Sequence, residues 1–162
     1  MGMGAKAYFL TWTTYGTWLP GDSRGWVDRR RRHGEVVEPP DPQREATARR
    51  AMKEEPVTLD AGLRRVVHKA MLDTAAYRGW FVHALEVRSN HVHVVATAED
   101  KAAEEVMRVL KAYASRALSK ARPERTGRWW TRQGSKRNLF TDKALAAAIR
   151  YVQKQGAVRM NE

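Results

Sequence analysis

Two β-prone runs, 80–87 and 91–97, are separated by only three residues in this chain. Both are rich in β-branched and aromatic side chains, as strands usually are. The residues between them, Arg88, Ser89 and Asn90, have the length and composition of a hairpin loop. The two runs are therefore expected to pair as antiparallel strands, which any sheet formed by this chain must contain.

Amphipathic helices are predicted on both sides of this hairpin. Apolar residues recur at helical spacing over 59–78, with Thr58 and Asp60 as possible caps, and again over 102–121. Three further elements complete the pattern: a strand at 7–13, a strand at 136–140 and a helix at 142–155. The order predicts an α+β fold, a ferredoxin-like split β-α-β antiparallel sheet with an added C-terminal helix.

A length of 162 residues fits one domain, 1–162, with a single insertion at about 15–56. Within the insertion the periodicity is lost among prolines and glycines, apart from a short helix expected over 43–53. Four consecutive arginines, Arg29 to Arg32, stand in its middle. Such a run can bind a nucleic acid, for example the stem of a hairpin, or it can form a solvated loop.

The composition favours a nucleic-acid partner. Thirty Lys and Arg against eighteen Asp and Glu give a formal net charge of +12, which suits a polyanion. Cys is absent, which excludes disulfides, thiolate metal sites and a cysteine nucleophile. No stretch approaches the roughly 20 apolar residues of a membrane span, and no secretory signal is recognisable. We therefore expect a cytoplasmic protein with no membrane partner, associated with the nucleoid if its nucleic-acid partner is DNA.

His91 and His93 are two residues apart on a predicted strand, so their side chains project from the same face. Two adjacent imidazoles can chelate one cation. For an isolated His-x-His, however, polar positions on a half-exposed strand are the more common explanation.

Tyr151 and Gln155 are four residues apart on the last predicted helix and should lie on one side of it. The apolar stripe of this helix is formed by Leu145, Ile149 and Val152, and Tyr151 lies on its flank, where it either borders a cleft or packs against the sheet. Phenol is a poor nucleophile at its ordinary pKa of about 10, but a divalent cation that polarises a phosphate can make it competent. The competing nucleophile, Tyr113, lies in an apolar stripe and is expected to pack in the core.

Four segments in order resemble the HUH-type single-tyrosine transposases, which include insertion-sequence transposases and REP-associated tyrosine transposases. The segments are 90–95 (NHVHVV), 110–116 (LKAYASR), 129–135 (WWTRQGS) and 149–155 (IRYVQKQ). The segment 9–13 (FLTWT) also resembles the first strand of the family, and 16–22 (GTWLPGD) resembles a segment that some members carry after it. The order and spacing of the four segments are far more specific than any one of them.

The resemblance implies that His91, His93 and Gln155 hold Mg²⁺ or Mn²⁺ and that Tyr151 is the catalytic nucleophile. In that family the tyrosine attacks single-stranded DNA near a hairpin, forms a covalent 5′-phosphotyrosine and leaves a 3′-hydroxyl that can later rejoin strands. Members act as monomers or homodimers, with the tyrosine working in cis or in trans. Two alternatives are a domesticated protein that binds nucleic-acid hairpins without cutting them and a metal-dependent phosphohydrolase that uses water.

A candidate DNA interface interleaves cations with two indoles just before the last helix. It comprises Arg128, Trp129, Trp130, Arg132, Lys136 and Arg137, together with Lys111 from the second family segment. Cations can bind phosphates while indoles stack unpaired bases. Equally, at least one of the two indoles can belong to the core.

Overall fold

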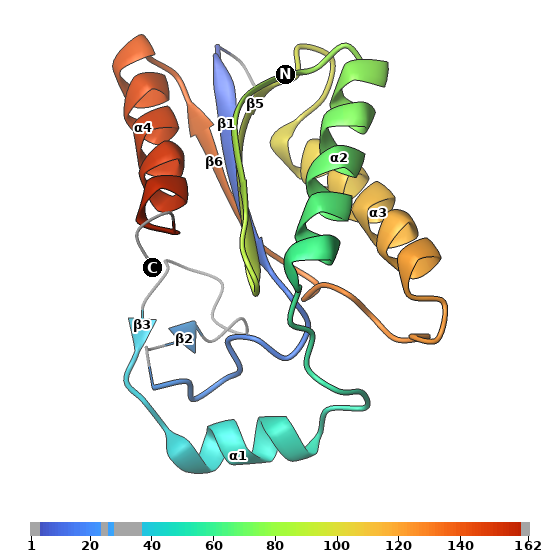
Figure 1. The fold of residues 1–162 in the computed structure, drawn as a ribbon. Coiled ribbons are helices and arrows are strands. Elements are labelled where there is room, and N and C mark those ends of the chain that lie inside the picture. The colour runs from blue at the N-terminus through green and yellow to red at the C-terminus, as the bar shows by residue number, and fades with distance from the viewer. Residues whose placement is uncertain (1–3, 24–25, 28–36, 160–162) are drawn as a thin grey trace.

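The computed structural model describes residues 4–23, 26–27 and 37–159, and in this part of the chain a four-stranded antiparallel sheet separates two helical layers (Figure 1). Helices α2 and α3 cover one face of the sheet and α4 covers the other, while α1 lies beyond one end of the sheet. The elements follow in the order β1 Ala7–Thr13, β2 Trp26–Val27, β3 Val37–Glu38, α1 Pro42–Arg50, α2 Ala61–Tyr77, β4 Phe81–Val87, β5 His91–Thr97, α3 Ala103–Ala121, β6 Ser135–Leu139 and α4 Asp142–Arg159.

The predicted ferredoxin-like sheet is confirmed. Its strand order is β4-β5-β1-β6, and β5 runs antiparallel to both of its neighbours. β1 and β4 are thus parallel strands with β5 inserted between them, which is the split β-α-β arrangement. The expected short helix in the insertion is α1. The small β2–β3 ladder was not predicted, because two residues per strand are too few for a periodic pattern.

The arginine run Arg29 to Arg32 and His33 lie outside the described residues. Among the helices that the structure describes, none is long and apolar enough to cross a membrane.

Two hydrophobic cores lie on opposite faces of the sheet, because side chains alternate along each strand. Between the sheet and the α2–α3 layer the core includes Leu10, Val94 and Leu110, all of them buried. On the other face a smaller core joins Val95 of β5 to Val152 of α4. His91 and His93 share the face of Val95 and therefore project toward the side that α4 covers.

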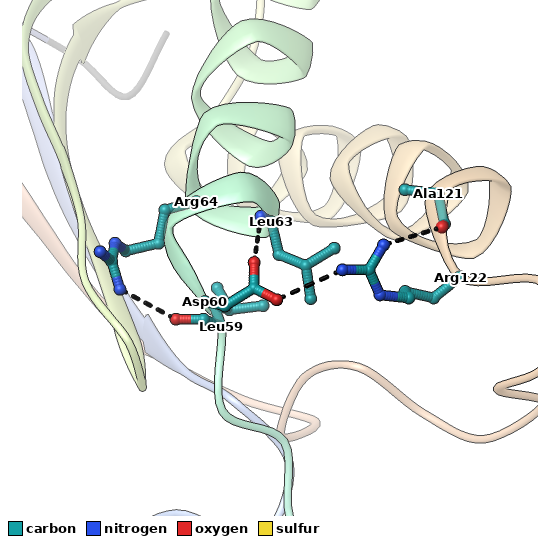
Figure 2. A network of polar contacts seen from close by, with 6 residues as sticks. All are labelled: Leu59, Asp60, Leu63, Arg64, Ala121 and Arg122. Atoms are coloured by element: carbon teal, nitrogen blue, oxygen red, sulfur yellow. Dashed lines mark hydrogen bonds and ion pairs between the residues drawn. The ribbon is translucent and has the colours of Figure 1, made fainter.

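A polar network ties the start of α2 to the end of α3 (Figure 2). The carboxylate of Asp60 caps α2 by accepting from the backbone N–H of Leu63 at 2.8 Å, and it pairs with the guanidinium of Arg122 at 3.2 Å. Arg122 also donates, at 3.1 Å, to the carbonyl of Ala121, which is the last residue of α3. The sequence expectation that Asp60 caps this helix is confirmed, and the cap also joins two helices of the same layer.

Replacing Asp60 tests how much this network stabilises the fold. Asp60→Ala should lower the thermal midpoint at pH 7, because it removes the α2 cap and the partner of Arg122. The matched variant is Asp41→Ala, which removes the same type of cap from α1, a helix with no buried residue. We expect a much smaller decrease for Asp41→Ala, and equal decreases in the two variants would contradict the prediction.

The contribution of Asp60 should also depend on pH. The backbone N–H of Leu63, and then Arg122, hold the pKa of Asp60 below its ordinary value. A carboxylate whose pKa is lowered by folding contributes stability above its unfolded pKa, near 4, and loses it as the pH falls further. The difference in midpoint between wild type and Asp60→Ala should therefore shrink in acid.

Candidate active site and nucleic-acid interface

His91 and His93 form a preoriented pair of imidazoles on β5. Their ring centroids are 4.7 Å apart, with the planes at 78°. Each ring is held through Nδ1, at 2.7 Å from Asn90 Oδ1 for His91 and at 2.9 Å from Thr11 Oγ1 for His93. Partners of this kind orient metal-binding histidines and leave Nε2 as the ligand atom. Asn90 and Thr11 therefore hold the two rings in the way that a cation site requires.

Burial keeps the imidazole of His93 uncharged. The ring lies beneath α4, and its pKa is lowered to about 4, first by burial and then by the neighbouring His91 and by Arg88. Neutral imidazole is the form that binds metal ions. At neutral pH, His93 is therefore in its ligand form without having to lose a proton.

Tyr151 lies next to the histidine pair in the same chain. Its ring meets that of His93 edge to face at a centroid distance of 5.7 Å, and that of Phe9 at 5.9 Å. Val152, the next residue, is buried in the smaller core, while Tyr151 remains 49% exposed. The prediction that Tyr151 stands on the flank of the apolar stripe is confirmed, and this flank borders the histidines.

A cleft between α4 and the sheet contains both Tyr151 and His93. It is lined by Phe9, Thr11, His93, Ser135, Arg137, Ala147, Ala148 and Tyr151. Arg137 reaches the cleft from β6, where it pairs with Phe9. A phenol, a neutral imidazole and a guanidinium thus line one cleft, a combination suited to a phosphodiester.

Gln155 and Glu86 are the candidates for completing a cation site. Gln155 follows Tyr151 by one turn and is partly buried, and its carbonyl accepts from Arg88 at 2.8 Å, which ties the end of α4 to the β4–β5 loop. Glu86 was missed by the sequence analysis, although it pairs with His93 across the β4–β5 ladder. The register of the predicted hairpin was the signal that could have found it.

The carboxylate of Glu86 lies close to Gly156 of α4, because a Cβ on this glycine would be 2.9 Å from Oε2. In the described part of the chain, no group of three or more His, Cys, Asp and Glu side chains is arranged to hold a metal ion. Of the side chains that the structure describes, none of these types is therefore a preformed third ligand for the histidine pair, and the oxygen atoms of Gln155, Glu86 and water remain as candidates. Nitrogen and oxygen donors, with open positions, fit a divalent cation that also binds phosphate.

Most of the predicted DNA-binding residues meet at one groove between α3 and the loop before β6. Lys111, Arg128, Trp129, Trp130, Arg132 and Lys136 all line it. Arg137 is the exception, because alternation along β6 turns it to the opposite face, into the cleft of Tyr151. The β6 edge thus carries cations toward both faces of the sheet.

The two indoles of this segment are nearly buried, which argues against the predicted base stacking. Trp129 is 5% and Trp130 is 3% exposed. Their indole N–H groups donate to Ser119 Oγ at 2.9 Å and to the carbonyl of Lys111 at 3.2 Å. The backbone of this segment bonds to that of β1 and the residues after it, and this pairing turns both rings into the core.

Lys111 helps to hold the same loop. Its ammonium donates to the carbonyl of Thr131 at 2.7 Å. A role for Lys111, Arg128, Arg132, Lys136 and Arg137 in binding DNA remains a prediction.

The expectation that Tyr113 packs in the core is wrong. Its ring is partly exposed, and the guanidinium carbons of Arg116 and Arg78 lie 4.7 Å and 5.9 Å from the ring centroid. Tyr113 is at the margin of the apolar stripe of α3, so two arginines cover the ring instead of the sheet. Hydrogen bonds from Arg78 and Arg116 lower the pKa of its phenol. Tyr113 belongs to α3, and the sheet lies between α3 and α4, which covers the face of the histidine pair (Figure 1). Within one chain, Tyr113 therefore cannot be the nucleophile at the histidines.

The solved structures that share this fold include two transposases. One is a predicted transposase from Deinococcus radiodurans R1, with a TM-score of 0.52 and 15% identity over 92% of this chain and 89% of that one. The other is a REP-associated tyrosine transposase bound to a REP hairpin, with a TM-score of 0.55 and 11% identity over 96% of this chain and 68% of that one. At these identities the likeness concerns the fold alone. A comparison with curated proteins found no significant match.

The sequence also matches the model of the IS200-like transposases over residues 50–155, which is more than half of the chain. This stretch includes the histidine pair, the β6 edge and the segment of α4 that carries Tyr151 and Gln155. The chain is therefore a member of the IS200-like transposase family.

Proposed function

We propose that this protein cleaves and rejoins single-stranded DNA near hairpins, with Tyr151 as its nucleophile. The observation that carries the proposal is the edge-to-face packing of the Tyr151 and His93 rings, whose centroids are 5.7 Å apart, in a cleft that Arg137 also lines. Membership of a transposase family supports DNA as the substrate. A hairpin is the partner favoured by the fold neighbour, which is bound to one.

The proposed step is a transfer of a phosphoryl group to a phenol. Oη of Tyr151 attacks the phosphorus, the bond from phosphorus to the 3′ oxygen breaks, and the 5′ phosphate stays on the tyrosine. The phenol loses a proton, and the departing 3′ oxygen gains one to become a hydroxyl. Attack by a 3′-hydroxyl on the phosphotyrosine reverses these changes and joins two strands, so no external energy source is required.

His91, His93 and Gln155 would hold the divalent cation, Mg²⁺ or Mn²⁺. When bound, the cation would polarise the scissile phosphate and offset its charge. The chain's own contribution is to hold the two imidazoles in fixed orientation and to place Arg137 in the cleft that Tyr151 also lines. These groups position the phosphodiester and favour the negative charge that builds up during attack.

The site requires only one chain. Tyr151 and His93 are in contact within a single protomer, so we propose that the tyrosine acts in cis and that a monomer is sufficient for cleavage. A homodimer remains compatible with this assignment, provided that each of its sites is built from one chain.

A covalent adduct tests the nucleophile. Wild-type protein incubated with Mn²⁺ and a hairpin-containing single strand labelled at its 3′ end should give a labelled protein band on a denaturing gel. Tyr151→Phe should reduce that band to the background of a sample without protein, because phenylalanine has no attacking oxygen. Tyr113→Phe is the matched control and should leave the band unchanged, since Tyr113 lies on the other side of the sheet.

An unchanged adduct in Tyr151→Phe would contradict the assignment. Cleavage that survives this substitution without any adduct would identify a phosphohydrolase that uses water. Tight binding without cleavage under any divalent metal would identify a hairpin-binding protein that does not cut.

A metal titration tests Gln155. Even outer-shell partners of metal ligands contribute roughly 10–100-fold to metal affinity, and a ligand should contribute no less. The Mn²⁺ concentration that gives half of the maximal adduct should therefore rise by at least about tenfold in Gln155→Ala. Gln153→Ala, on an exposed position of the same helix, should behave like wild type. Equal titration curves for the two variants would exclude Gln155 as a ligand.

Mixing two inactive variants tests the assignment in cis. Tyr151→Phe keeps the histidine pair and His93→Ala keeps the tyrosine, so a site shared between two chains would recover activity in the mixture. We expect no adduct above the sum of the separate samples. Recovery that rises with protein concentration would show that Tyr151 acts on the histidines of a second chain.

A further inference from the structure

A second pocket adjoins the cleft of Tyr151 at the end of β1. It has a volume of about 700 Å³, within the range of ordinary ligand sites, roughly 300–1,000 Å³. Two of its walls are the segment 15–20 and the loop before β6, from Arg128 to Ser135. Arg44 of α1 and Met52, just after α1, complete the lining. Thr11 and Ser135 line both the pocket and the cleft. A strand lying in the cleft can therefore extend into this pocket.

Hydrogen bonds hold the pocket walls in place before any ligand arrives. The buried hydroxyl of Thr14 donates to the carbonyl of Val57 at 2.7 Å and lies 2.8 Å from the hydroxyl of Thr17. The backbone N–H of Tyr15 donates to the carbonyl of Trp129 at 2.9 Å, which joins the two main walls. The phenol of Tyr15 accepts from the backbone N–H of Lys53 at 3.1 Å. These bonds link the insertion to the loop before β6.

Trp18 lines this pocket in a backbone conformation that tryptophan rarely adopts. Its φ is 59°, in the left-handed region, and among the described residues it is the only one other than glycine with a positive φ. Its ring is 49% exposed. A loop that needed only this turn would be more stable with Gly or Asn at the position. Strain of this kind persists where the surroundings enforce it, often at binding sites.

The neighbouring glycines explain how the surroundings enforce it. Gly16 and Gly21 flank Trp18 and also have a positive φ. A Cβ on Gly16 would collide with Met52 and Pro56, and one on Gly21 would collide with the backbone at the start of α1. Close packing on both sides leaves the intervening loop little freedom and keeps the indole of Trp18 at the pocket.

The charges of the pocket select its occupant. Arg44, Arg128 and Arg132 line the pocket together with the aromatic rings of Tyr15 and Trp18. Aromatic rings that stack bases, next to cations that bind phosphates, are the combination by which proteins bind single-stranded nucleic acid. An apolar peptide would fill the aromatic part of the pocket but would offer no phosphate to the guanidiniums of Arg128 and Arg132.

We propose that this pocket binds one unpaired base of the DNA strand that Tyr151 cleaves. The base stacks on Trp18, and Arg128 and Arg132 contact the phosphates beside it. The identity of the strand rests on the proposed function, whereas the pocket itself does not use Tyr151. The first wall, 15–20, precedes the stretch that matches the family model, whereas the second wall, in the loop before β6, lies within that stretch.

Binding without chemistry tests the proposal. All proteins carry Tyr151→Phe, and the probe is the DNA hairpin that binds this protein most tightly from a pool with randomised single-stranded flanks. Each flanking nucleotide is replaced in turn by an abasic residue, and affinity is measured by fluorescence anisotropy. One position should weaken binding roughly 5- to 100-fold, the usual effect of losing one stacked base.

The added substitution Trp18→Asn should abolish that effect, so that the abasic and intact probes bind equally. Asn tolerates the left-handed conformation, and an unchanged thermal midpoint will show that the loop has kept its fold. Trp18→Phe should retain most of the abasic effect. Tyr77→Asn, which removes an exposed ring from α2, should retain all of it.

Arg132→Gln provides a second test, independent of the loop. It should weaken binding of the intact probe and reduce the slope of log affinity against log salt by about one, as expected for one lost phosphate contact. Arg65→Gln, an exposed arginine on α2, should leave the slope unchanged.

The proposal is overturned if no abasic position matters, or if the abasic effect persists undiminished in Trp18→Asn. Failure of the proposed function is a separate result. If Tyr151 forms no adduct while the coupling between Trp18 and one base is intact, the chemistry is wrong and the base pocket stands.

Discussion

The pairing of β5 with its two neighbours is the constraint on which the site depends. His93 pairs with Glu86 on one side and with Thr11 on the other, and this register directs both histidines to the face that α4 covers. A slip of one residue would exchange them with Val92 and Val94, bury two imidazoles in the larger core and expose two valines. The apolar side chains of β5 therefore enforce the placement of its polar ones.

Helix α4 turns this face of the sheet into a site. It buries Val152 and Ala148 against Val95, and this small core determines which side of the helix faces the cleft. The ring of Tyr151 then packs against His93 and Phe9 while about half of the residue stays exposed, so the phenol is held but remains accessible. Arg88 holds the far end of the helix through the carbonyl of Gln155. Packing and one hydrogen bond thus fix the position of Tyr151, the proposed nucleophile, relative to the histidine pair.

The β6 edge connects the site to the rest of the molecule. The loop before β6 bonds to β1 and to the segment after it, and so buries Trp129 and Trp130 while leaving Arg128 and Arg132 exposed. The indoles stabilise the groove, and the cations give it its charge. The insertion packs on the same edge and adds Trp18, so that the exposed aromatic ring of this region comes from a segment distant in the sequence.

Periodicity and spacing determined the elements, the sheet order and the Asp60 cap. They also placed His91 and His93 on one side of a strand, and Tyr151 and Gln155 on one side of a helix. Alternation and helical repeats are local properties of the chain, which is why a sequence reveals them. Only the tertiary structure decided which of two tyrosines meets the histidines, since both Tyr113 and Tyr151 lie on amphipathic helices. It also decided that Trp129 and Trp130 are buried while Trp18 is exposed, and that Glu86 lies opposite His93. Burial and cross-strand register depend on partners far away in the sequence, which no local pattern specifies.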